Sequence, residues 1–486
     1  MKIGTDTTRR TACLAALTAA AMLVQGYHPY AEDAEIYLPG VLKLLNPNLY
    51  PSHAEFFGQH AGYSLYSRLI AASVQLIHLR PEWVTFLWQA ISIFLLLVGT
   101  WRLSAALFED ARARWGAVTL MAALLTLPVA GTALYIVDQY LNPRNLAAFA
   151  AVFAVAETLH RKYVRAFLWL AFAAAVHPLM SSFAIMFCVW VALLERIRPR
   201  ALGFAALAMP FGIFDRAPQA YHEVAMRQSY FFVVRWEWYE WLGLIGPVLL
   251  FWCLARWSRR RGMSNIDLVS RAMIPFILVA LIAALVLSIP GRMEVLARFE
   301  PLRCLALAYM VLIVIGGGLL GQYVLKARAW RWLALFVPLS AGMFVAQREL
   351  FPASQHIEAP WSKPRNLWAQ AFDWVREHTS NDAVFALDPR HMALQGEDEN
   401  GFRARAQRSR LADAVKDKGA ASAFPPLSVN WLEQVRDQEG WERFQVKDFE
   451  RLQAKYGVSW IVVRQPGPDG LDCPYENETV RVCRVQ

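Results

Sequence analysis

The segment 26–40, "GYHPYAEDAEIYLPG", directly follows the first apolar run of the chain and carries Glu32, Asp33 and Glu35 within four positions. The preceding run, 11–27, is long enough for a helix that crosses a bilayer. The three carboxylates are therefore predicted to lie at a membrane surface. Either they serve chemistry at that surface, or they are solvated loop charges.

The composition indicates a membrane protein. The chain has 486 residues, of which 56% are hydrophobic, and a mean hydropathy of +0.28. Long apolar runs recur before residue 350, and none follows it. The net charge of +10 comes from short basic clusters between apolar runs, the pattern of cytoplasmic membrane loops. Membrane lipid is thus the expected surrounding, and no nucleic-acid partner is expected.

Apolar runs predict about eleven transmembrane helices. They are 11–27, 84–107, 116–137, 146–159, 166–176, 178–194, 201–214, 241–255, 271–289, 303–325 and 332–349. The stretch 61–79 is also long enough to span, but Arg68, His78 and several serines interrupt it.

Loop charge decides how 61–79 is interpreted. If it does not span, the inside loops hold 18 lysines and arginines in 51 residues, and the outside loops hold 10 in 105. If it spans, the basic loops all face outward, against the positive-inside rule. We therefore predict that 27–83 is one large outer loop with interfacial helices at 33–45 and 61–79.

The polar tail is predicted to be a small α/β domain, 352–486, on the same side as this loop, following a transmembrane domain, 1–351. Its expected elements are helices at 363–379 and 447–457 and strands at 383–388, 458–463 and 480–485. The charged stretch 391–422 fits no clear element. Cys473 and Cys483 flank a predicted strand–turn–strand, so we expect a disulfide between them if the tail lies in an oxidising compartment.

Four short motifs accompany this layout: "YAEDAEIY" (30–37), "DQYLNPRN" (138–145), "HPL" (177–179) and "FEPLR" (299–303). Together with the layout they resemble the GT-C superfamily of membrane glycosyltransferases, and most closely its bacterial members. The resemblance implies a polyprenyl-phosphate-linked sugar donor and transfer with inversion to an acceptor in the cell envelope. The tail lacks the WWD-like motif of oligosaccharyltransferases, which argues against transfer of a preassembled oligosaccharide to asparagine.

Inverting transfer to a hydroxyl needs a base that takes the acceptor's proton, and a positioned carboxylate can do this. Asp33 is the predicted base, with Glu32 and Glu35 as alternatives. Asp138, at the end of the third predicted span, would bind the acceptor or share a divalent cation with Asp33; a polar helix end is the alternative. No cofactor is certain, and metal dependence is left open.

The leaving phosphate needs cationic partners, and arginine binds phosphate oxygens with two parallel hydrogen bonds. Arg303 opens the tenth predicted span, with Arg298 and Arg292 just before it, and is the predicted phosphate ligand. Snorkelling to lipid head groups is the alternative. Arg144 and His177 are further substrate-binding candidates, although His177 would equally satisfy a neighbouring backbone group.

The sequence thus predicts a multi-pass protein of the bacterial inner membrane, with a cytoplasmic N-terminus and a periplasmic C-terminal domain. The predicted activity is glycosyl transfer on the outer face. The alternatives are a transporter or flippase for a lipid-linked glycan, which needs a polar path to both faces, and a non-catalytic membrane subunit. The enzyme hypothesis requires Asp33, Asp138 and Arg303 to meet at one cavity.

Overall fold

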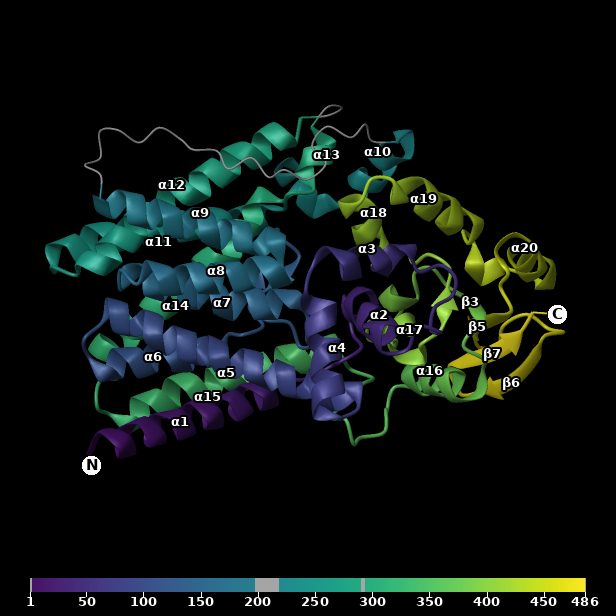
Figure 1. Cartoon of the computed structure of the whole chain (residues 1–486), viewed down its shortest axis with the longest axis horizontal. Helices are drawn as coiled ribbons and strands as arrows, with labels where there is room; N and C mark the ends of the chain where they lie inside the picture. Colours follow the sequence, from purple (N-terminus) through teal and green to yellow (C-terminus); the bar gives the residue numbers. More distant parts are fainter. Residues whose placement is uncertain (1, 197–217, 290–292, 486) are drawn as a thin grey trace.

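The computed structural model describes residues 2–196, 218–289 and 293–485. Long helices stack side by side in one half of the molecule, and the C-terminal region with its sheet forms the other half (Figure 1). Helices α2, α3 and α4 lie between the two halves in this view. The first loop after α1 is therefore the place where the two halves meet.

The long helices follow the predicted apolar runs closely. They are α1 (Lys2–Gln25), α5 (Pro81–Leu107), α6 (Ala111–Ala123), α7 (Pro143–Leu159), α8 (Tyr163–Val176), α9 (Pro178–Arg196), α11 (Trp238–Arg260), α12 (Ser264–Leu287), α14 (Leu305–Leu319) with the π-helical η4 (Leu320–Leu325), and α15 (Ala329–Leu350). In the described part of the chain, six helical stretches are long and apolar enough to cross a membrane. The predicted count of about eleven is not confirmed, and the predicted span 201–214 lies outside the described residues.

The predicted span 116–137 is wrong in its second half. Helix α6 ends at Ala123, and the chain continues as a short antiparallel hairpin of β1 (Pro128–Val129) and β2 (Leu134–Tyr135). Pro128 cannot donate to a helical ladder, and Gly131 has a φ of +67°, where a Cβ atom would lie 2.3 Å from Trp236. Non-helical backbone at this depth is tolerated where protein or a cavity covers it.

The basic loops gather at one end of the helices. Asn265 donates to the carbonyl of Ala106 at 2.7 Å, and Arg161 pairs with Glu195 at 2.6 Å. The first contact joins the start of α12 to the end of α5, and the second joins the α7–α8 turn to the end of α9. We call this the basic end, and the opposite end, which carries the C-terminal region, the site end.

The stretch 61–79 is divided between α3 (Glu55–Tyr63) and α4 (Tyr66–Ile77). A helix of 12 residues is about 18 Å long, too short to cross a bilayer. The predicted helix at 33–45 is α2 (Ala34–Leu45), but most of its residues are buried, and it packs on α3, α4 and the C-terminal region. It is thus enclosed by protein rather than lying at a lipid interface.

The C-terminal region contains a five-stranded sheet in the order β4-β3-β5-β7-β6. Strand β3 runs parallel to β4 and β5, and β7 runs antiparallel to β5 and β6. The elements are α16 (Leu367–His378), β3 (Val384–Leu387), η5 (His391–Ala393), α17 (Phe402–Ala406), β4 (Ser409–Arg410), α18 (Asp417–Ala423), α19 (Leu427–Asp437), η6 (Trp441–Arg443), α20 (Val446–Tyr456), β5 (Trp460–Arg464), β6 (Asp472–Glu476) and β7 (Val480–Arg484). Both helices and the three strands predicted from the sequence are present.

Short elements connect the helices at the site end. They are α10 (Gln219–Met226), η1 (Ser229–Phe231), η2 (Val233–Arg235), α13 (Glu294–Ala297) and η3 (Pro301–Cys304).

The C-terminal region fixes the backbone of the acidic loop after α1. The amide of Tyr27 donates to His356 O at 3.0 Å, and the amide of Glu32 donates to Glu399 O at 2.9 Å. The amide of Gly401 donates to Tyr30 O at 2.8 Å. The segment that carries the three carboxylates is therefore clamped between two segments of the tail.

Candidate active site

A cavity of about 910 Å³ opens where the site end of the helices meets the C-terminal region. Ten segments of the described chain contribute to its wall. They are the acidic loop, α3, the β1–β2 hairpin, the 138–144 loop, the α8–α9 junction, η1 with Gln228, the start of α11, the 298–303 segment and residues 415–419 and 423–426. Of the residues proposed from the sequence, Glu32, Asp33, Asp138, Arg144, His177, Arg298 and Arg303 line it. Glu35 does not, and Arg292 lies outside the described residues.

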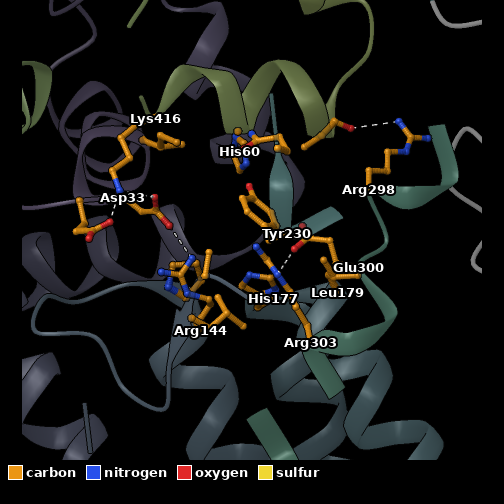
Figure 2. A pocket seen from close by; sticks show the side chains of 18 of the residues that line it. Asp33, His60, Arg144, His177, Leu179, Tyr230, Arg298, Glu300, Arg303 and Lys416 are labelled. Carbon is orange, nitrogen blue, oxygen red and sulfur yellow. Dashed lines mark hydrogen bonds and ion pairs between the residues drawn. The ribbon is translucent and has the colours of Figure 1, made fainter. Parts of the chain in front are cut away.

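Arg144 joins the two aspartates of the site. Its Nη1 donates to Asp33 Oδ2 at 2.7 Å (Figure 2). Its Nη2 and Nε donate to Asp138 Oδ2 at 3.0 and 3.2 Å. Nη2 also lies 3.2 Å from the hydroxyl of Tyr140. The guanidinium thus occupies the space between the carboxylates and orients both.

The turn before α7 explains why Arg144 faces the cavity. Asn142 is the N-cap of α7 and accepts from the amide of Asn145 at 3.0 Å, while Pro143 takes the first helical position. The side-chain amide of Asn145 donates to Tyr140 O at 2.9 Å. Asn142 and Asn145 are buried and shape the loop, whereas Arg144 lines the cavity.

The two aspartates differ in their surroundings. Burial alone would raise the pKa of Asp33, but Arg144 and Lys416 outweigh it and hold the pKa well below its ordinary value. Burial of Asp138 dominates over Arg144 and raises the pKa of Asp138. In this arrangement Asp33 is ionised and weakly basic.

Lys416 is a site residue that sequence reasoning missed. It lies immediately before α18, and its Nζ pairs with Glu32, with Glu399 at 3.5 Å and with Asp33 at 3.8 Å. Burial alone would lower the pKa of Lys416, but these three carboxylates hold it above its ordinary value. Its only signal in the sequence is membership of a charged stretch, which is also typical of solvated surface.

Glu35, an alternative base in the sequence analysis, is placed elsewhere. Its side chain is fully buried, and its Oε1 lies 3.3 Å from Arg403 Nη1. Arg403 also binds Asp417 with two hydrogen bonds of 2.9 and 2.7 Å. This buried chain of charges joins the first turn of α2 to the residue after Lys416, so Glu35 braces the site and does not face its cavity.

Arg303 and its neighbours form the opposite wall of the cavity. Arg303 pairs with Glu300, and its guanidinium carbon lies 5.8 Å from the ring centre of Tyr230. Arg298 donates to Ala423 O at 3.2 Å, which ties this segment to α18. In Figure 2 Arg303 lies beside Glu300 and away from the Asp33–Lys416 pair.

Two histidines complete the wall. The sequence prediction that two helices meet at His177 is confirmed, because α8 ends at Val176 and α9 begins at Pro178. His177 Nδ1 accepts from the amide of Met180 at 3.3 Å, which leaves Nε2 protonated as a donor. His60 packs edge-on against Tyr37 and Phe424.

Arg144 occupies the position between the two aspartates that the sequence offered as metal ligands. A cation shared by Asp33 and Asp138 was one option from the sequence, and the guanidinium now lies between these carboxylates. Among residues 2–196, 218–289 and 293–485, no group of three or more His, Cys, Asp and Glu side chains is arranged to hold a metal.

Cys473 and Cys483 are bonded to each other across the β6–β7 hairpin, and neither lines the cavity. The hairpin contains a register shift between Asp472 and Tyr475. The four remaining cysteines, Cys13, Cys188, Cys253 and Cys304, are free.

No protein-family model and no curated protein matches the chain. Among solved structures, the chain is similar to the mycobacterial arabinofuranosyltransferase AftD, with 14% identity and a TM-score of 0.46, over 98% of this chain and 40% of that one. It is also similar to the archaeal oligosaccharyltransferase AglB from Archaeoglobus fulgidus, with 11% identity and a TM-score of 0.44, over 94% and 70%. The chain spans less than half the length of AftD.

Proposed function

We propose that this protein transfers a sugar from a polyprenyl-phosphate-linked donor to an acceptor hydroxyl, with inversion, on the outer face of the bacterial inner membrane. The observation that carries the proposal is that Asp33 and Arg303, from distant parts of the sequence, line one cavity at the site end of the apolar helices. A base and a phosphate ligand are the two groups that such a transfer needs at the membrane surface.

In the proposed step, the acceptor oxygen attacks C1 of the sugar while Asp33 takes the hydroxyl proton. The bond between C1 and the phosphate oxygen breaks, and its electron pair leaves on that oxygen as polyprenyl phosphate. The products are the glycosylated acceptor and a carrier phosphate with one more negative charge, and the proton passes from Asp33 to water. A positioned general base typically contributes about 10²–10⁴-fold to the rate.

The other residues have separate tasks in this proposal. Arg144 orients Asp33 by a 2.7 Å hydrogen bond and is itself held by Asp138. Arg303 binds the donor phosphate and exchanges its pairing with Glu300 for phosphate oxygens. His177 offers an Nε2–H donor to the sugar or to the phosphate.

The alternatives fit the geometry less well. A transporter requires a polar path along the helices, whereas this cavity is lined by residues of the site end and the C-terminal region. A non-catalytic subunit needs no buried polar cluster, and Asp138 and Arg144 form one.

The test is transfer by the purified full-length chain in nanodiscs, assayed against a panel of polyprenyl-phosphate sugars and envelope acceptors. Asp33→Asn should lower the rate by about 10²-fold or more while donor binding survives. Arg303→Ala should weaken donor binding by about 10-fold or more. Asp472→Asn and Arg451→Ala are matched controls, since both residues form ion pairs on exposed surface away from the cavity.

Full activity of Asp33→Asn would remove this residue from the base role. Unchanged donor affinity and rate in Arg303→Ala would leave it as a lipid-facing arginine. Absence of transfer with every donor, together with transport of a lipid-linked glycan across proteoliposomes, would replace the enzyme by the transporter.

A further inference from the structure

We propose that Lys416 is a further catalytic residue, whose ammonium moves from the carboxylates of Glu32, Asp33 and Glu399 to the donor phosphate when the donor binds. This inference rests on the proposed function. It assigns a role to a residue of the C-terminal region, within the charged stretch 391–422 for which the sequence predicted no clear element.

The backbone of Lys416 is fixed, and its side chain is long enough to change partners. Its amide donates to Asp413 Oδ1 at 2.6 Å, and the next residue, Asp417, is held by Arg403. Its side chain is 13% exposed and lines the cavity. A lysine ammonium is a point charge on a flexible four-carbon stem, so it can change partners without moving the backbone.

Two cations, Arg144 and Lys416, lie beside Asp33 and are held by different numbers of hydrogen bonds. Arg144 is held by Asp33, Asp138 and Tyr140 through four hydrogen bonds, and moving it would leave Asp138 buried without its cation. Lys416 donates one hydrogen bond, to Glu32, and its contacts with Asp33 and Glu399, at 3.8 and 3.5 Å, are longer than hydrogen bonds. Lys416 is therefore the cation that an incoming anion displaces most easily.

The donor phosphate and the carboxylates of the acidic loop carry charge of the same sign. A phosphodiester that approaches this site meets the negative charges of Asp33 and Glu32, and like charges at short range in a partly buried site repel strongly. An ammonium with three donors can bridge the phosphate and these carboxylates and so remove the repulsion. In Figure 2 Lys416 lies next to Asp33 and reaches into the pocket from the opposite side to Arg303. The phosphate would thus be held from two sides.

In this proposal, donor binding also increases the basicity of Asp33. With Lys416 on the carboxylates, Asp33 is flanked by two cations, which suppress its basicity. When the ammonium turns to the phosphate, Asp33 keeps only Arg144 and becomes the stronger base. Because the phosphate gains a negative charge as the C1–O bond breaks, the same contact strengthens in the transition state and lowers the barrier.

The experiment measures binding and turnover separately in nanodiscs with the full-length protein. Binding of a sugar-free polyprenyl phosphate is followed by microscale thermophoresis, and kcat, KM and the pH profile are followed with the best donor from the panel. Lys416→Ala should weaken carrier binding by about 10-fold or more and also lower kcat. Lys416→Arg should restore binding in part. Lys455→Ala is the matched control, because this lysine also pairs with two carboxylates, Glu433 and Asp437, but on exposed surface.

The acid limb of kcat/KM reports the contact between Lys416 and Asp33 in the free enzyme, whereas binding of the sugar-free carrier reports the phosphate contact. Removing Lys416 takes one cation away from Asp33, so the pKa of Asp33 in the free enzyme rises and the acid limb moves to higher pH. Glu32→Gln should act in the opposite sense on binding, since it removes a competitor for the ammonium. Carrier affinity should then equal or exceed that of the parent.

Failure of the Lys416 inference and failure of the proposed function would give different results. If the protein transfers sugar but Lys416→Ala keeps the parent's KM, kcat and acid limb, the inference is overturned and the proposed function stands. If no donor is turned over but carrier binding depends on Lys416, the phosphate contact stands and the proposed transfer does not. If Lys416→Ala loses binding only because it unfolds, Lys416→Arg and Glu32→Gln decide, and weaker binding in Glu32→Gln overturns the inference.

Discussion

Replacement of Arg144 by methionine would separate the structural role of this arginine from its role in the reaction. Arg144 is 11% exposed and contacts Asp33 and Asp138 at 2.7 and 3.0 Å. Asp33 keeps Lys416 as a second cation, but Asp138 is 6% exposed, and among the described residues its carboxylate would keep the side-chain amide of Asn142 as its hydrogen-bond donor. Most of the cost therefore falls on Asp138.

The expected loss of stability follows from that burial. Removing one partner of a buried ion pair typically costs about 3–5 kcal/mol, because the other charge is left uncompensated, whereas replacing both partners by neutral groups is often close to neutral. Arg144→Met should thus destabilise the fold strongly. Arg144→Met combined with Asp138→Asn should regain most of the loss.

Activity should not follow stability. In the double variant no unpaired charge remains at position 138, but Asp33 has still lost the 2.7 Å bond that orients it. We expect transfer to stay at least about 10²-fold below the parent, the scale of a misplaced catalytic group. Thermal unfolding in detergent and transfer in nanodiscs measure the two effects on the same preparations, with Arg484→Met plus Asp472→Asn as an exposed ion-pair control.

Two results would refute this reasoning. If Arg144→Met were as stable as the parent, Asp138 would not be the buried, arginine-dependent carboxylate described above. If the double variant recovered full activity, Arg144 would serve only to neutralise Asp138, and Asp33 would need no orienting partner.

Three further predictions concern the surroundings of the site. Burial raises the pKa of Glu35 to about 7 from an ordinary 4.5, so the folded form keeps a proton that the unfolded chain loses between these values; stability should fall by about 3 kcal/mol as pH rises through this window. Glu35→Gln should flatten this dependence, and an unchanged slope of unfolding against pH would contradict it. Cys473 and Cys483 should resist alkylation in unreduced, denatured protein if the tail lies outside, whereas two labelled thiols would exclude the disulfide. Alkaline phosphatase fused after residue 400 should be active and fused after Arg260 inactive, and the reverse pattern would place the site in the cytoplasm.

The residues of the cavity that the sequence did predict share one property. Asp33, Asp138, His177 and Arg303 each lie at the end of an apolar run, and alternating runs return the chain to the same end of the helices. Hydropathy and loop charge therefore suffice to bring them to one end. They do not supply the contacts, such as the guanidinium of Arg144 between the two aspartates.

The contribution of the C-terminal region could not be predicted. Lys416 and Glu32 are separated by 384 positions, and Arg403 and Glu35 by 368. Such pairs leave no local period or cap in the sequence, and a charged stretch that becomes a buried network looks the same as one that stays solvated. The predicted domain boundary at 352 does not separate the tail from the site, because the tail supplies Lys416 to the cavity and Arg403 to the buried pair with Glu35.

The error at 116–137 has a different cause. Apolar content measures burial and not helicity, and residues such as Leu125, Val129 and Ile136 are buried in the irregular segment as they would be in a helix. The backbone groups are satisfied locally instead, for example by Val137 N–H donating to Leu125 O at 2.8 Å. Pro128 and Gly131 were the only signals against a continuous helix, and each also occurs in transmembrane helices.

The backbone separates the three carboxylates of the opening segment into three different environments. Glu32 has a φ of +57°, an uncommon conformation for a residue other than glycine, which directs it to Lys416. Asp33 immediately precedes α2 and meets Arg144. Glu35 lies in the first turn of α2, two residues and about 200° of helical rotation beyond Asp33, and so enters the buried brace on the far side. Glu32 and Glu35 therefore have main partners other than Arg144, and Asp33 is the one of the three carboxylates that is hydrogen-bonded to Arg144 inside the cavity.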